Sequence, residues 1–169
     1  MHTTQANEFM CSRAQDPREG VKLTLLLAVD PNRGHVAHWV FPGNVTREAY
    51  VVFLNAVLFP ALQAQSGAVR RYIMADNLSV HTGPEVEAEF AAAGHVPLMR
   101  PVHSPDFGPV ECCFSSLEMF LERITSAVTA DNLAEWVECW ASTLSASNTV
   151  GYWTHCHYRI AGEPYTPYE

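Results

Sequence analysis

The chain has 169 residues, of which 48% are hydrophobic and 11% aromatic, and this length supports one well-packed domain rather than two. Its 18 acidic and 10 basic side chains give a formal net charge of -8, which argues against an extensive, non-specific grip on nucleic-acid phosphates, because Lys and Arg make most such contacts. Five cysteines without Cys-x-x-Cys spacing, and the lack of a signal-like leader or a long apolar run, favour free thiols. We therefore expect an intracellular protein, nuclear or cytoplasmic, with no membrane association.

The first third of the chain predicts a hairpin. Residues 1–20 are polar and poorly patterned, and we interpret them as an irregular segment in which only Glu8–Cys11 could form a short strand. Val21–Val29 is nearly continuously apolar, which is typical of a strand buried on both faces. A turn signal over 30–34 leads into a second strand over His35–Phe41, so the two strands should pair.

The remainder predicts helices that alternate with short strands. Pro60 should kink or end the first helix, and Pro97 places the second short strand close to a sheet edge. The aromatic segment 151–158 is expected to pack back on the domain as a tail. This order predicts a mixed α/β unit with helices on both sides of a sheet. The predicted elements are a helix after Thr46 that extends to Leu62, a strand over 71–75, a helix between Thr82 and Gly94, a strand over 96–99, and helices that begin near Val110 and near Thr129 or Asp131.

Two acidic residues stand where ligand sites of α/β sheets tend to form. Asp76 follows an apolar strand, so its carboxylate should emerge at the carboxyl end of that strand. Glu111 begins a helix, and the 34 residues between the two acids hold one helix and one strand, which returns the chain to the same end of the sheet. Clustered carboxylates bind hard divalent cations that serve phosphodiester chemistry. Taken singly, Asp76 could close a local turn and Glu111 could favour a helix start.

The sequence around both acids resembles a known family. Ile73-Met-Ala-Asp-Asn-Leu-Ser-Val-His81 is similar to the hydrophobic-Asp-Asn-x-x-x-His signature of the mariner-like DDE transposases, and His103-Ser-Pro-Asp-Phe-Gly-Pro-Val-Glu111 resembles their Tyr-Ser-Pro-Asp-Leu-Asn-Pro-Ile-Glu. The 34-residue gap is also that of the group, and Gly151-Tyr-Trp-Thr-His-Cys156 resembles the closing motif of fungal members. The resemblance covers about residues 21–158.

This resemblance implies an RNase H-like fold, DNA as the substrate class and Mg²⁺ or Mn²⁺ as the cofactor. It implies that Asp76 and Glu111 are catalytic residues and metal ligands. A homodimer is left open. For His81, a hydrogen bond to its own turn and a role near the metal are equally supported. The implied supporting residues are Asn77, His81, Ser104, Pro105 and Asp106.

The chain also departs from the family pattern. The family places its first catalytic Asp on the strand before the Leu-rich one, usually as Asp-Glu, and no such pair precedes Leu23. We therefore expect an N-terminally truncated chain with an incomplete first strand. Glu8, after Asn7, is the nearest substitute, whereas Asp30 lies in the hairpin turn and should project away. We also expect the chain to lack the N-terminal helix-turn-helix domain of the family. Three further replacements are Gly108 for Asn, His103 for Tyr and Glu118 for a usual Lys.

We therefore predict an irregular segment over 1–20, an RNase H-like DDE domain over 21–160 and a C-terminal tail over 161–169. The predicted function is a transposase-derived DDE endonuclease domain that is catalytically impaired, and binds metal weakly, without its first Asp. Two alternatives stay open. One is a non-enzymatic interaction module or decaying remnant, which the acidic charge favours. The other is a metal nuclease of the same fold that is unrelated to transposition.

Overall fold

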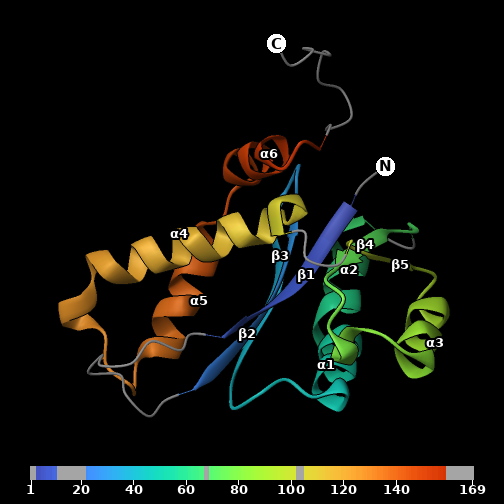
Figure 1. Ribbon diagram of the computed structural model, residues 1–169, viewed down its shortest axis with the longest axis horizontal. Coiled ribbons are helices and arrows are strands. Elements are labelled where there is room, and N and C mark those ends of the chain that lie inside the picture. Colours follow the sequence, from blue (N-terminus) through green and yellow to red (C-terminus); the bar gives the residue numbers. More distant parts are fainter. Residues whose placement is uncertain (1–2, 11–21, 67–68, 102–104, 159–169) are drawn as a thin grey trace.

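The computed structural model describes residues 3–10, 22–66, 69–101 and 105–158, and a five-stranded sheet lies at its centre (Figure 1). The strands lie in the order β3-β2-β1-β4-β5. β1, β2 and β3 form antiparallel pairs, whereas β4 runs parallel to both β1 and β5. This mixed sheet, with β5 at one edge, confirms the predicted α/β class and the edge position of the Pro97 strand. The strands are β1 (Thr3–Met10), β2 (Leu23–Asp30), β3 (Gly34–Pro42), β4 (Tyr72–Ala75) and β5 (Val96–Met99).

Strand β1 corrects the interpretation of the N-terminus. The sequence favours an irregular segment over 1–20 with an incomplete first strand, but residues 3–10 form an eight-residue strand at the centre of the sheet. The prediction is wrong there because β1 is polar. A strand paired on both sides is held by two ladders of backbone hydrogen bonds, and these leave no hydrophobic period in the sequence. Residues 11–20 and the predicted tail over 161–169 lie outside the described residues.

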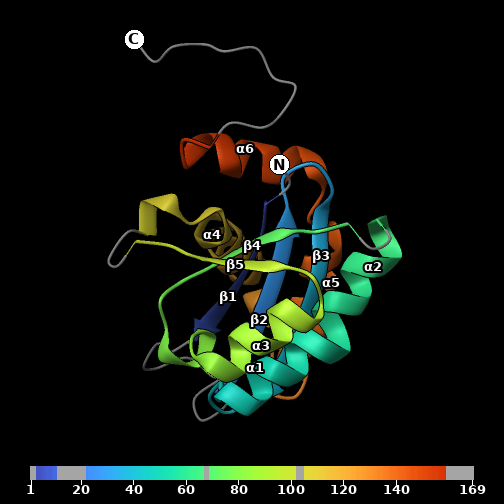
Figure 2. The same ribbon diagram turned by 90° about the vertical axis from the view of Figure 1, so that its right-hand side faces the viewer.

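Two groups of helices cover the two faces of the sheet, as predicted (Figures 1 and 2). The apolar run of β2 explains why both faces need cover, because alternate residues of a strand point to opposite sides. Leu26 and Ala28 belong to the core beneath α1, α2 and α3, whereas Leu25 and Leu27 belong to the core beneath α4, α5 and α6. The helices are α1 (Arg47–Phe53), α2 (Phe59–Ser66), α3 (Pro84–Ala92), α4 (Pro109–Arg123), α5 (Leu133–Thr143) and α6 (Ala146–His155).

The first predicted helix does not end at Pro60. It contains a π-helical turn, η1 (Leu54–Leu58), between α1 and α2. Pro60 has no N–H to donate to the preceding turn, and the wider π turn, in which the N–H of Phe59 donates to the Leu54 carbonyl, accommodates this loss. The chain therefore bulges before the proline and stays helical to Ser66.

The aromatic segment 151–158 is not a tail but the second half of helix α6 and the turn that follows it. It packs back on the domain, as predicted. Helix α6 holds the turn between β2 and β3, because the buried hydroxyl of Thr149 donates to the Asp30 carbonyl over 3.0 Å. Gly34 in that turn has φ of +83°, and a Cβ there would lie 2.3 Å from the carbonyl oxygen of Leu144. Only glycine fits this contact.

The cysteines in the described part of the chain, Cys112, Cys113, Cys139 and Cys156, are free, as predicted. Cys113 and Cys156 are buried packing residues. Burial raises the pKa of Cys156 to about 12, which keeps its thiol protonated at neutral pH. No helix among the described residues has both the length and the apolar character needed to cross a membrane.

Candidate active site

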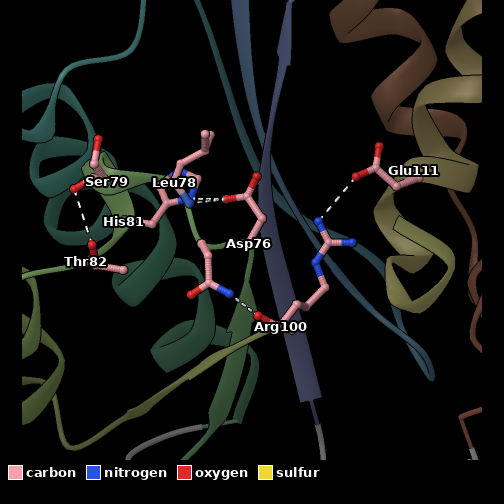
Figure 3. Close-up of polar contacts among 8 residues, drawn as sticks. Asp76, Leu78, Ser79, His81, Thr82, Arg100 and Glu111 are labelled. Atoms are coloured by element: carbon pink, nitrogen blue, oxygen red, sulfur yellow. Dashed lines mark hydrogen bonds and ion pairs between the residues drawn. The ribbon is translucent and has the colours of Figure 1, made fainter. Parts of the chain in front are cut away.

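Asp76 leaves the carboxyl end of β4, as the sequence predicts, and its side chain turns toward His81 (Figure 3). The Asp76 Oδ1 atom lies 2.5 Å from Nδ1 of His81. His81 ends the short turn η2 (Ser79–His81) and is fully buried, with the ring of Tyr50 at a centroid distance of 4.4 Å. Asp76 itself is 26% exposed. The buried imidazole therefore holds a carboxylate that still reaches the surface.

Opposing effects set the pKa of Asp76. Burial raises it, but the hydrogen bond and charge of His81, the N–H of Leu78 and the charge of Arg100 together lower it below the usual range of an aspartate. The carboxylate is thus ionised at neutral pH. Burial, and secondarily the charge of Asp76, raise the pKa of Tyr50 above its usual range, so its hydroxyl stays neutral.

Glu111 lies in the first turn of α4, and its carboxylate points toward Arg100 (Figure 3). Arg100 directly follows β5, and its Nη2 atom lies 3.3 Å from Oε1 of Glu111. Arg100 is 6% exposed and Glu111 42%, so the cation is more deeply buried than its partner. Arg100 was not predicted from the sequence, because a lone Arg belongs to no periodic pattern. Its only signal is a charged residue directly after an apolar strand.

Two neighbours position Arg100. The side-chain amide of Asn77 donates to the Arg100 carbonyl, which ties the end of β4 to the end of β5. The Arg100 N–H donates to the Ala75 carbonyl over 2.9 Å. Gly108, the residue before α4, leaves room for the guanidinium, because a Cβ there would lie 1.8 Å from Arg100 Nη1. Asn77 therefore supports the site through Arg100.

Strand β1 runs beside Asp76. Its Cα register pairs Thr4 with Ile73 and Gln5 with Met74 on β4. The same register, continued by two residues, brings Asn7 level with Asp76. In this extended register an asparagine therefore stands level with Asp76.

The two faces of β1 separate Asn7 from Glu8. In the antiparallel ladder Asn7 lies opposite Leu27 and Glu8 opposite Leu26. Directly opposite residues share a face of the sheet, and Leu27 belongs to the core beneath α4, whereas Leu26 belongs to the core beneath α1–α3. Asn7 thus shares the face of the helix that carries Glu111. Glu8, the predicted substitute for the missing acid, has its position on the opposite face.

This arrangement does not fit a divalent cation. Mg²⁺ and related ions prefer several free oxygen ligands. The part of the chain that the structure describes contains no group of three or more His, Cys, Asp or Glu side chains that could hold an ion. Asp76 is already engaged by His81, and Glu111 by the Arg100 guanidinium. A second positive charge beside Arg100 would be repelled.

The remaining predicted residues lie around this centre. Asp106 is exposed in the turn η3 (Pro105–Phe107), which Pro105 begins, and Ser104 falls outside the described residues. Asp30 points away from the site, as predicted. It ends β2 at the opposite end of the sheet, and its Oδ1 accepts the Asn32 N–H over 2.8 Å.

Comparison with known proteins identifies the family. The DDE superfamily endonucleases match residues 10–134. Structures of the Mos1 transposase catalytic domain with raltegravir and Mn or Mg match with TM-scores of 0.69 and 20% identity, and the match covers 92% of this chain and 76% of that chain. A pre-cleavage Mos1 transpososome matches with a TM-score of 0.70 and 19% identity over 92% of this chain and 52% of that chain. A search of curated proteins found no match.

The structural likeness, at 20% identity, confirms the predicted RNase H-like fold. The chain spans about half of the Mos1 chain in the transpososome. The family match covers most of the sequence and includes both Asp76 and Glu111. The chain therefore belongs to the DDE superfamily endonucleases.

Proposed function

We propose that this chain is a transposase-derived DDE domain whose DNA-cleaving chemistry is impaired. The observation that carries the proposal is Asn7, level with Asp76 on the face covered by α4. The DDE motif calls for three acidic side chains. This chain offers Asp76, Glu111 and, at the adjoining strand position, a neutral amide.

The replacement has a clear chemical consequence. A carboxylate supplies two acceptor oxygens and a negative charge, whereas the Asn side chain supplies one acceptor oxygen, two N–H donors and no charge. Such a site attracts a hard cation less strongly. In this proposal the first strand of the fold is present as β1, and its acid is replaced rather than lost with the strand.

DNA is the proposed partner by family. Structures of Mos1 include a pre-cleavage transpososome and a paired-end complex with the left transposon end. The net charge of -8 argues for weak, salt-sensitive binding of this chain to DNA. A DNA partner is consistent with the nuclear or cytoplasmic location inferred from the sequence.

A plasmid-nicking assay with Mg²⁺ or Mn²⁺ tests the proposal. We expect no metal-dependent nicking by the wild-type chain and a gain of nicking by Asn7→Asp, because a third carboxylate lets a metal ion compete with the Arg100 guanidinium. The gain should vanish in Asn7→Asp/Asp76→Ala, which controls for contaminating nuclease. Metal-dependent nicking by the wild type that is lost in Asp76→Ala would overturn the proposal that the domain is catalytically impaired.

The second candidate is a non-enzymatic interaction module. Its support is that both acids already have internal partners, together with the acidic net charge. It predicts no DNA binding at moderate salt. Fluorescence anisotropy with a labelled duplex at 50 and 200 mM salt separates the candidates, since salt-sensitive binding in the micromolar range favours the DDE domain.

A further inference from the structure

Arg100 is a buried cation with incomplete hydrogen bonding. Its Nε and Nη1 atoms are buried and have no partner among the described residues, while Nη2 contacts Glu111. A buried charge with free donors lowers stability unless a nearby opposite charge compensates. Glu111 is the contacting carboxylate, and the charge of Arg100 also acts on Asp76. The positive charge of the guanidinium therefore acts on both candidate metal ligands.

The space for this guanidinium depends on Gly108. The φ of Gly108 is -112°, an ordinary value for any residue, so glycine is not needed there for conformation. It is needed for volume. An added Cβ would lie 1.8 Å from Arg100 Nη1, 2.9 Å from Cζ and 3.0 Å from Cγ of Glu111. Any larger side chain at 108 must expel the guanidinium.

We propose that Arg100 is a built-in counter-ion that takes the electrostatic place of a divalent cation at Glu111 and keeps such an ion out, in a space that Gly108 provides. The inference rests on the proposed function only for the identity of Asp76 and Glu111 as the metal positions. Because the guanidinium is part of the chain, it compensates the negative charges of the two acids even when no metal ion is bound. A divalent ion has to displace it or bind beside it against repulsion.

Mn²⁺ binding, followed by the electron paramagnetic resonance signal of the free ion, tests the proposal without any cleavage reaction. We expect Arg100→Met to bind Mn²⁺ at least about tenfold more tightly than the wild type, because a charge in contact with the ligand is removed. Met keeps an unbranched apolar stem in the buried space. The matched control is Arg123→Met, which removes the same charge from the exposed end of α4, about 18 Å of helix from Glu111. It should bind Mn²⁺ like the wild type.

Gly108→Asn provides an independent route, because it retains Arg100 but fills its space. Asn is also a favoured residue before a helix, so the variant should remain folded. We expect a gain in Mn²⁺ affinity similar to that of Arg100→Met. The double variant should gain no more than either single variant, since both remove the same contact.

Equal Mn²⁺ affinity of the wild type and a folded Gly108→Asn variant would overturn the proposal, whether or not Arg100→Met folds. So would tight, micromolar binding of Mn²⁺ by the wild type. These outcomes are distinct from failure of the proposed function, which shows as nicking by the wild type. A rise in the melting temperature with Mn²⁺, seen in the variants and not in the wild type, would support the proposal by a second measurement.

Discussion

At the scale of single residues, the carboxylate of Asp76 depends on a ring that is itself fully buried. His81→Phe keeps most of the ring volume against Tyr50 but removes the donor to Asp76. We expect the pKa of Asp76 to rise and the free energy of unfolding to fall by about 1–2 kcal/mol. Carboxyl ¹³C titration by NMR and urea unfolding measure the two effects, and the exposed His155→Phe is the control.

The sign of the pH effect follows from the lowered pKa of Asp76. A carboxyl group whose pKa is lower in the folded state stabilises the protein above its unfolded pKa, and this contribution disappears as the pH falls through the folded pKa. His81→Phe should therefore lose less stability than the wild type on acidification below about pH 4. An unchanged acid response would mean that His81 does not hold the charged form of Asp76.

The residues of the site were predictable to different degrees. Asp76 and Glu111 follow from local motifs and their spacing, so sequence is enough to find them. Asn7 gains its meaning from the register between β1 and β4, and Arg100 from burial beside Gly108. Neither register nor burial of a lone polar residue leaves a local pattern. The proposed loss of activity rests on Asn7, and the proposed exclusion of a metal ion rests on Arg100.

At the scale of elements, the turn between β2 and β3 is fixed by its contact with the start of α6. Gly34→Ala places a Cβ against the Leu144 backbone at a residue with positive φ, so two penalties add. We expect a loss of more than about 3 kcal/mol in urea unfolding. Gly43→Ala is the matched control, because its φ is also positive but nothing lies within 4 Å, and it should lose only about 1 kcal/mol. Similar losses in both variants would show that the contact is unimportant.

Strand β3 carries a histidine pair that should make the fold acid-sensitive. A register shift in the β2–β3 ladder breaks the alternation along β3, and His35 Nε2 lies 2.7 Å from His38 Nδ1. Burial, and secondarily the charge of His38, lower the pKa of His35 to about 4. Burial also lowers the pKa of His38, although the charge of Glu138 opposes this. The fold therefore favours the neutral rings.

Because the folded-state pKa values are depressed, the stabilisation is present above pH 6.5 and is lost as the pH falls from 6.5 toward 4. We expect the free energy of unfolding to fall by roughly 1–2 kcal/mol between pH 7 and pH 4.5 because of this pair, since solvent screening reduces the effect of two partly exposed rings. His35→Gln should remove most of that loss. The exposed His155→Gln should retain it, and a wild-type loss in His35→Gln would contradict the assignment.

The elements most visible in the sequence are those with strong apolar patterns. The continuous run of β2 and the helical spacing in α4 and α5 are predicted correctly. The start of α1 after Thr46 is also predicted, and Thr46 Oγ1 caps this helix by accepting the Ala49 N–H over 3.2 Å. Helix α6 is missed because its aromatic residues suggest packing rather than a period. The π turn before Pro60 is missed because it depends on how the helix accommodates a lost donor.

At the scale of the whole molecule, β1 joins the two halves of the sheet. It links the antiparallel β2–β3 hairpin to the parallel pair β4–β5, and the sheet has no other contact between these halves in its strand order. Without residues 1–10, β2 and β4 would each present an unpaired edge. We therefore expect the shortened chain to lose cooperative unfolding in urea and to aggregate, whereas Asn7→Ala, which keeps the backbone of β1, should unfold cooperatively.

A peptide of residues 1–10, added in trans, should restore cooperative unfolding to the shortened chain, because strand addition satisfies both edges at once. The same peptide with Ala6→Pro should fail, since proline removes a donor and is not tolerated in a central strand. Far-ultraviolet circular dichroism during urea unfolding, at increasing peptide concentration, measures the rescue. If the shortened chain unfolds cooperatively without the peptide, the two halves of the sheet are held together by their helices. In that case β1 is not required for the domain to fold.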